Sequence, residues 1–324
     1  MATVMSNEHT DEAPPRRRAP ALPTQLLLGL FLVALVVYFS VSSPYFLSVD
    51  NFRNILLSVA VLGVVAVPAT LLMVSANVDL SVGSAAAFCG MLFAVVAEDH
   101  GLALGVAAAL AGGLLAGAVN GGLVALIGIN SIITTLGMLS VLRGATKLVS
   151  NGQTVGIDGF RGLGSGSLAG VPTPVWIFAL VAAAFVVLMR YTAFGRGIYA
   201  LGANPHAARL VGIRPAPNLF ALFVISGGLA ALAGLILTSQ LRAATPLSAE
   251  GLELSVVAAV LLGGASLTGG RGTVVGTLVG VLILGTLNNG LTILNVTSFW
   301  QEVARGGVLI LAVGLDQLRR LRRD

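Results

Sequence analysis

The sequence contains few of the residues that build catalytic or metal sites. It has one cysteine, Cys89, inside an apolar run, which excludes an intrachain disulfide and a cysteine-rich metal site. Its three histidines, His9, His100 and His206, are far apart and give no support for a metal cluster. No nucleophile and base have a suitable spacing for catalysis. We therefore expect that the chain is not an enzyme and has no catalytic residue, metal or cofactor.

Lysine and charge are scarce as well. Lys147 is the single lysine, so the glycine-rich segment 263–272, GGASLTGGRG, lacks the Gly-Lys-Ser/Thr end of a phosphate-binding P-loop. Any ATP that the protein uses must therefore be bound by a partner chain. The formal net charge is +5, but the basic residues flank apolar stretches, where they set membrane orientation. We expect no nucleic-acid partner.

Apolar residues are abundant instead. They make up 56% of the chain against 10% charged residues, and the mean hydropathy is +0.96. A soluble domain has about 25% charged residues. Since about 20 apolar residues cross the hydrocarbon core, the sequence predicts an all-α polytopic membrane protein with about ten transmembrane helices. The predicted spans are Thr24–Ser42, Phe52–Ser75, Ser81–Ala97, Leu102–Ile127, Ile132–Val149, Val175–Met189, Leu219–Gln240, Leu252–Leu267, Thr273–Leu294 and Phe299–Leu315.

Basic residues at the ends of these spans predict the orientation. They gather at the N-terminus, in the loop 190–217 and at the C-terminus, and the positive-inside rule places all three in the cytoplasm. We expect a transmembrane domain over residues 24–318, between a disordered cytoplasmic tail, 1–23, and a basic cytoplasmic tail, 319–324. Residues 150–174 are too polar for lipid and predict an extramembrane loop.

Two short segments recur in the same order. Asp79-Leu-Ser-Val is echoed by Glu253-Leu-Ser-Val, and Asn120-Gly-Gly-Leu by Asn288-Asn-Gly-Leu. The copies are five predicted spans apart, and an odd displacement inserts them in opposite senses, as in transporters with inverted repeats. The match is weak because similarities of four residues arise readily in an apolar chain.

The segment Asn77–Ser84 is a polar break between two apolar runs, and Asp79 is its carboxylate. A charge at membrane depth costs a few kcal/mol unless it is paired or hydrated, which makes the break a candidate functional site. In one interpretation Asp79 caps the helix that follows. In the other the break, with Ser81, Gly83 and Ser84, lines or gates a translocation path.

Asparagines inside apolar spans are further candidates for that path. Asn288 and Asn289 form one polar pair, and Asn120 lies in an earlier span. Each of them either holds helices together by hydrogen bonds, worth about 1 kcal/mol or less, or forms a hydrophilic patch beside the path.

The loop 190–217 predicts a short helix over His206–Val211. Asn204 and Pro205 are suited to its N-cap and first turn, and Gly212 to its end. A helix presented in a cytoplasmic loop suits docking to a soluble partner. Alternatively, the arginines of this loop only enforce topology and touch anionic membrane lipid.

Together, several motifs resemble those of the membrane permease subunits of ribose-type ABC importers, from about residue 54 to residue 316. The one departure is Asn77-Val78, where the family usually has Gly-Ile before the aspartate. The segments that carry the resemblance are Asn77-Val-Asp-Leu-Ser-Val-Gly-Ser84, Ile132-Ile-Thr-Thr-Leu-Gly137 with Arg143-Gly144, Asn151-Gly-Gln153, Gly195-Arg-Gly-Ile-Tyr-Ala-Leu-Gly-Ala-Asn204 with Ala208-Arg209-Leu210, Ala258-Ala-Val-Leu-Leu-Gly-Gly264 with Gly269-Gly-Arg-Gly272, and Leu287-Asn-Asn-Gly290.

The resemblance implies a monosaccharide importer of the bacterial inner membrane, built from two like or unlike permease subunits. It also implies two cytoplasmic ATP-binding subunits and an extracytoplasmic sugar-binding protein. By resemblance, Asp79–Gly83 and Leu287–Gly290 line or gate the path. The same resemblance implies that the loop that couples the permease to the ATPase contains Arg196, Gly202, Asn204, Arg209 and Gly212. The alternatives are a permease for branched-chain amino acids or nucleosides and, from another class, an ion-coupled secondary transporter.

Overall fold

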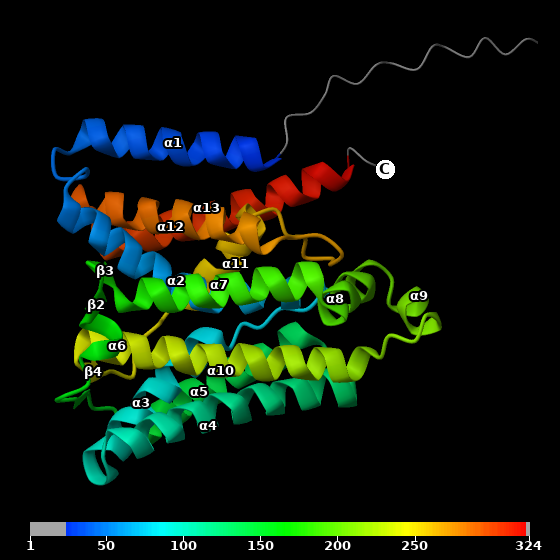
Figure 1. Cartoon of the computed structure of the whole chain (residues 1–324), viewed down its shortest axis with the longest axis horizontal. Helices are drawn as coiled ribbons and strands as arrows, with labels where there is room; N and C mark the ends of the chain where they lie inside the picture. Colours follow the sequence, from blue (N-terminus) through cyan, green and yellow to red (C-terminus); the bar gives the residue numbers. More distant parts are fainter. Residues whose placement is uncertain (1–23, 322–324) are drawn as a thin grey trace, which may run out of the picture.

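The computed structural model describes residues 24–321 and is almost entirely helical (Figure 1). Its helices are α1 (Thr24–Ser42), α2 (Val49–Val74), α3 (Val82–His100), α4 (Leu102–Gly121), continued by the π-helix η1 (Gly122–Ile127), α5 (Ser131–Val149), α6 (Gly162–Ser165), α7 (Thr173–Tyr191), α8 (Ala193–Ala203), α9 (Pro205–Leu210), α10 (Pro215–Leu241), α11 (Leu252–Leu262), α12 (Val274–Ile293) and α13 (Ser298–Leu321). The antiparallel strand pairs are β1 (Val155–Gly156) with β4 (Ala243–Ala244) and β2 (Ser167–Leu168) with β3 (Val171–Pro172).

The predicted class, an all-α polytopic membrane protein, is confirmed. Seven of the described helices are long and apolar enough to cross a membrane. Two shorter apolar helical segments, Leu28–Ser42 and α11, accompany them. The seven are α2, α3, α4 with η1, α5, α7, α10 and α12.

The two ends of the helix bundle differ in what they carry (Figure 1). At one end, which we call the strand end, lie the two small sheets and α6. At the other, the α9 end, lie α8 and α9, and both ends of the described chain point towards it. Most of the predicted loop 150–174 is thus at the strand end, and the basic loop 190–217 lies at the α9 end.

Helix α2 forms the centre of the bundle. Every residue from Val59 to Val74 is buried, because this helix is apolar on all sides and packs on α7, α10, α11 and α12. Peripheral helices expose large apolar side chains instead, as the lipid-facing surface of a membrane protein does. Examples are Leu30 of α1, Leu115 of α4, Ile133 of α5 and Leu180 of α7.

Glycines let α4 and α10 cross closely. A Cβ at Gly227 would overlap the carbonyl oxygen of Gly113 and lie 2.8 Å from the amide nitrogen of Gly117. Small residues at helix contacts are typical of membrane proteins, in which van der Waals packing drives helix association. Both helices also reach the polar break, α4 through Asn120 and α10 through Ser226.

Two sequence predictions about these elements were wrong. Helix α8 forms where the sequence predicts a loop, because three glycines in eleven residues disfavour a helix by about 1 kcal/mol each. The span predicted over Leu252–Leu267 ends at Leu262, where the turn containing Gly264 at φ +90° begins. The span predicted to end at Leu315 lies within α13, and this helix runs on to Leu321. The predicted tail 1–23 and residues 322–324 lie outside the described residues.

Candidate functional site

The polar break between α2 and α3 spans residues 75–81, so it is shorter than the predicted Asn77–Ser84. Helix α2 ends with Ser75 as its C-cap, and Ala76 turns the chain at φ +61°. The amide of Asn77 still donates to the carbonyl of Leu72, at 2.8 Å. Helix α3 begins at Val82, which places Gly83 and Ser84 in its first turn and not in the break.

The Asp79 carboxylate is buried in this break and accepts three hydrogen bonds. Its Oδ1 accepts from the amide and the hydroxyl of Ser81, at 2.9 and 2.6 Å. Its Oδ2 accepts from the hydroxyl of Ser226, in the middle of α10, at 3.0 Å. The side chain is 4% exposed. Asp79 does not bond the amides of the first turn of α3: the N-cap is Ser81, whose side chain makes no capping hydrogen bond.

Asn120 of α4 joins the same network. Its Nδ2 donates to Ser81 Oγ at 2.9 Å, and it is buried. Asp79, Ser81 and Asn120, which the sequence singled out, are therefore brought together, and Ser226 completes the group. Sequence reasoning missed Ser226 because a lone serine in an apolar span carries no signal of its own.

Side chains at the start of α5 contact the backbone of the break at Val78. The amide of Val78 donates to Ser131 Oγ at 3.3 Å. The Thr135 hydroxyl donates to the carbonyl of Ser131 at 2.8 Å and lies 3.4 Å from the carbonyl oxygen of Val78. Side chains from α4, α5 and α10 thus satisfy the polar groups of a non-helical segment inside the bundle. Irregular backbone at membrane depth requires such partners.

Gly83 and Ser84 have separate roles in the first turn of α3. The Ser84 hydroxyl donates to the carbonyl of Ser81 at 2.8 Å. A Cβ at Gly83 would overlap Oε2 of Glu253, in the first turn of α11, and lie 2.8 Å from the carbonyl oxygen of Ala249. Gly83, the residue directly after the first echoed segment, therefore packs against Glu253, the first residue of the second.

Asn288 and Asn289 do not belong to the Asp79 network. Asn289 Nδ2 donates to Asn51 Oδ1 at 2.8 Å, and Asn51 Nδ2 donates to the carbonyl of Phe46. This contact joins α12 to the start of α2. Oδ1 of Asn288 and Oδ1 of Asn289 are buried without a partner among the described residues. The candidate path residues therefore form two groups.

The loop 190–217 folds as two helices, α8 and α9, and its second helix confirms the prediction. Asn204 Oδ1 accepts from the amides of His206 and Ala207, both at 3.0 Å, and so caps α9. Gly212 follows the helix at φ +83°. At the tip of α9, Leu210 and Val211 are 89% and 75% exposed.

Gly202, near the end of α8, is packed against backbone on two sides. A Cβ at this position would overlap the carbonyl oxygen of Val74 and lie 2.6 Å from the amide nitrogen of Gly270. Gly270 belongs to the segment 263–273 between α11 and α12, which we call the glycine loop, and its amide donates to the same Val74 carbonyl at 2.8 Å. Helix α8 thus contacts the end of α2 directly before the break.

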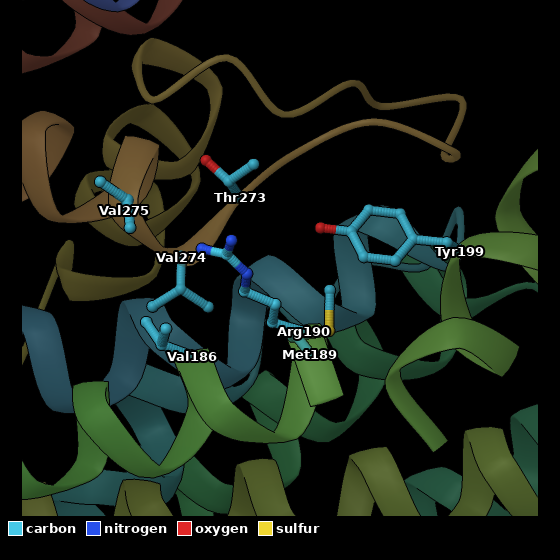
Figure 2. A pocket seen from close by; sticks show the side chains of 7 residues that line it. All are labelled: Val186, Met189, Arg190, Tyr199, Thr273, Val274 and Val275. Carbon is cyan, nitrogen blue, oxygen red and sulfur yellow. The ribbon is translucent and has the colours of Figure 1, made fainter. Parts of the chain in front are cut away.

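A second contact holds α8 to the glycine loop beside a pocket of about 390 Å³ (Figure 2). The Tyr199 hydroxyl donates to the carbonyl of Gly272 at 2.7 Å. Burial raises the pKa of Tyr199, which keeps this donor protonated. Figure 2 shows Tyr199 and Arg190 approaching the pocket from α8 and α7, with Thr273 at the start of α12.

Within the described residues, no group of three His, Cys, Asp or Glu side chains is placed to hold a metal ion. The Asp79 carboxylate accepts hydrogen bonds on both oxygens from protein donors, and the bond from Ser226 joins the break to α10. A helical bundle with seven apolar helices long enough to cross a membrane, a buried polar break and a projecting pair of short helices at one end defines a polytopic membrane protein.

The comparisons with known proteins agree with that class. The chain belongs to the family described as the permease component of the branched-chain amino acid transport system, whose model matches residues 51–313. An L-arabinose ABC transporter permease protein of Azospirillum brasilense is 39% identical, with 100% of this chain and 98% of that protein aligned. A ribose import permease protein of Escherichia coli is 42% identical over 89% of this chain and 92% of its own length. One of Bacillus subtilis is 40% identical over 90% of this chain and 91% of its own length. No solved structure matches.

Proposed function

We propose that the chain is the membrane-spanning permease subunit of an ABC importer of the bacterial inner membrane that moves a monosaccharide, ribose-like or related, into the cytoplasm. The observation that carries this is the near-complete alignment with an arabinose permease and two ribose permeases. The family description also names branched-chain amino acids, which makes such an amino acid the second candidate solute.

In this proposal the α9 end faces the cytoplasm and α9 docks on an ATP-binding subunit. Support comes from the basic residues of the loop 190–217, which favour the cytoplasmic side. Leu210 and Val211 are large apolar side chains exposed outside the bundle, and burial against a partner would remove them from water. A second permease subunit and an extracytoplasmic sugar-binding protein complete the importer, and lipid covers the apolar periphery.

Transport would follow from movement of α8 and α9. Hydrolysis of ATP in the partner would shift α9, and α8 would pass the shift to the end of α2 through Gly202. The break would respond because it is the non-helical link that follows. Docking changes the conformation only if the partner binds one state more tightly than the other.

The test is reconstitution of the complete importer in proteoliposomes, with its ATP-binding subunit and purified binding protein. We expect uptake of D-ribose or L-arabinose that needs all components and hydrolysable ATP. Leucine uptake would favour the second candidate solute. Uptake driven by a proton or sodium gradient without ATP would refute the proposal in favour of a secondary transporter.

A further inference from the structure

Two adjoining hollows form a groove between α7 and α12. The first is the pocket of about 390 Å³ beside Tyr199, and the second has a volume of about 490 Å³ (Figure 2). Val186 lines both, so the second continues from the first. All ten residues that line the second hollow are apolar, and α2 supplies its floor. The groove opens outwards, because Ala179 and Ala183 of its lining are exposed.

The ends of two spans fix the depth of the groove in the membrane. Helices α7 and α12 are both long and apolar enough to cross it, and the pocket lies where α7 ends and α12 begins. Arg190 is about 26 Å along α7 from Thr173, close to the ~30 Å thickness of the hydrocarbon core. The pocket is therefore at one edge of the apolar layer. The second hollow extends into that layer for about 16 Å along α7, from Val186 to Val175.

This edge of the groove carries positive charge only. The segments 189–203 and 263–275 supply all but one of the residues that line the pocket, and they contain Arg190, Arg196 and Arg271 but no Asp or Glu. The Arg190 guanidinium lies 5.6 Å from the centre of the Tyr191 ring and has no carboxylate partner among the described residues. Figure 2 shows it reaching across the pocket towards the start of α12.

We propose that the groove binds one phospholipid with an anionic headgroup. An acyl chain lies in the apolar hollow, and Arg190 holds the phosphate. Basic pockets between transmembrane helices suit anionic headgroups, and a guanidinium can donate two parallel hydrogen bonds to a phosphate. Lipid reaches this groove because large apolar side chains beside it are exposed on both helices. They are Leu180 and Val187 of α7 and Val275 of α12.

A second copy of the chain fits the groove less well than a lipid does. Two like subunits usually meet through the same face of each. Neither α7 nor α12 contains Asp or Glu, so a second copy of this face would bring Arg190 and no carboxylate. An anionic phospholipid supplies both the apolar chain and the negative charge that the face lacks.

A bound headgroup would join helices that belong to the proposed coupling. The pocket is lined by α7, α8 and the start of α12, and the Tyr199 hydroxyl of α8 donates to the carbonyl of Gly272 beside it. The lipid would thus hold α8 against the glycine loop. The inference goes beyond the proposed function, because it requires a membrane protein but no particular solute.

The first experiment measures lipid binding to the detergent-purified full-length chain by native mass spectrometry. The chain is titrated with phosphatidylglycerol and, separately, with phosphatidylcholine of the same acyl chains. We expect one phosphatidylglycerol to bind at least fivefold more tightly than phosphatidylcholine. Arg190→Gln should remove this preference and Arg190→Lys should keep most of it. Arg53→Gln, at an exposed arginine of the strand end, is the control and should leave the preference unchanged.

A second pair of variants tests the apolar part of the groove. Ala183→Phe places a ring in the hollow, so it should weaken binding of phosphatidylglycerol at least fivefold. The matched control is Ala184→Phe, at the next residue of α7, which is also exposed but does not line the groove. It should leave the binding unchanged. Equal weakening by both variants would contradict a site in the groove.

Two further results would overturn the proposal. One is an unchanged lipid preference in Arg190→Gln or unchanged binding in Ala183→Phe. The other comes from Ala183→Cys in a Cys89→Ala background, oxidised in native membranes. We expect the chain to stay monomeric on a denaturing gel, and a disulfide-linked dimer would show that a second subunit covers the groove. None of these measurements needs transport, so a failure of sugar uptake would leave them unaffected.

Discussion

Gly202 of α8 lies directly against the carbonyl group of Val74, the last residue of α2, with no room between them for a side chain. The contact joins the part of the chain that projects from the bundle to the residue that precedes the break. This contact is the atomic basis of the coupling that we propose between α8 and the break.

Gly202→Ala should uncouple the importer. The added Cβ overlaps the Val74 carbonyl, so α8 must move away from the end of α2, at a cost of roughly 1–3 kcal/mol. We expect uptake to fall at least fivefold and stimulation of ATP hydrolysis by the binding protein to weaken. Both are measured in proteoliposomes. Gly137→Ala, on α5 with nothing near its would-be Cβ, is the control. Normal uptake in Gly202→Ala would show that the contact does not transmit movement.

Substitutions in the Asp79 network should destabilise the folded protein to different degrees. Asp79→Leu leaves the hydroxyl of Ser226 and the amide and hydroxyl of Ser81 without their acceptor, at about 1–3 kcal/mol for each unsatisfied buried group. Asp79→Asn and Ser226→Ala should cost less. The measurements are the thermal unfolding of the detergent-solubilised complex and sugar uptake.

A double-mutant cycle on Asp79 and Ser226 tests whether their hydrogen bond contributes to stability. We expect Asp79→Asn and Ser226→Ala to be non-additive by 0.5–3 kcal/mol, as contacting residues usually are. Ser42→Ala, which removes an exposed hydroxyl bonded to Tyr38, is the control and should change stability little. Strict additivity would contradict the pairing of Asp79 with Ser226.

Exposed apolar residues at the tip of α9 should carry affinity for the ATP-binding subunit. Leu210→Ser and Val211→Ser remove the apolar surface that docking would bury, and Asn204→Ala removes the cap of the helix. We expect each to weaken binding of the purified ATP-binding subunit about tenfold, which corresponds to 1.4 kcal/mol. Calorimetry or surface binding would measure it.

The matched control for α9 is Leu148→Ser. This leucine of α5 is 79% exposed and lies far along the chain from the loop 190–217. Its substitution should leave the affinity of the ATP-binding subunit unchanged. Equal weakening by Leu148→Ser would mean that the loss of an apolar residue, and not docking by α9, explains the effect.

Adjacent glycines of α10 offer a test of helix packing. Gly227→Ala places a methyl group on the carbonyl of Gly113 and the amide of Gly117, both rigid backbone groups of α4. Gly228→Ala meets Leu114 Cδ2 at 3.1 Å, the flexible end of a side chain that can turn away. We therefore expect Gly227→Ala to lower the unfolding temperature of the complex clearly and Gly228→Ala to change it little. The reverse order would contradict the crossing of α4 and α10.

Local signals in the sequence predicted much of the fold. Apolar length predicted the membrane class and most long helices, because each span satisfies its backbone internally and needs no distant partner. Asn204, Pro205 and Gly212 predicted α9 almost to the residue, since caps act within one turn. Helix α8 escaped prediction because its glycines disfavour a helix, while the burial of Ile198 and Leu201 stabilises it.

The sequence by itself therefore determined that this chain is an all-helical membrane protein with a polar break at Asp79 and a capped helix after Asn204. Only the tertiary structure decided that Ser226 completes the Asp79 network, that Gly202 meets Val74 and that Glu253 packs on Gly83. The physical reason is that helices apolar on every side carry no periodic signal of which face meets which neighbour. Which face meets which neighbour depends on small residues, far apart in the chain, at which two helix backbones approach closely. Only the packing of the helices in three dimensions brings these residues together.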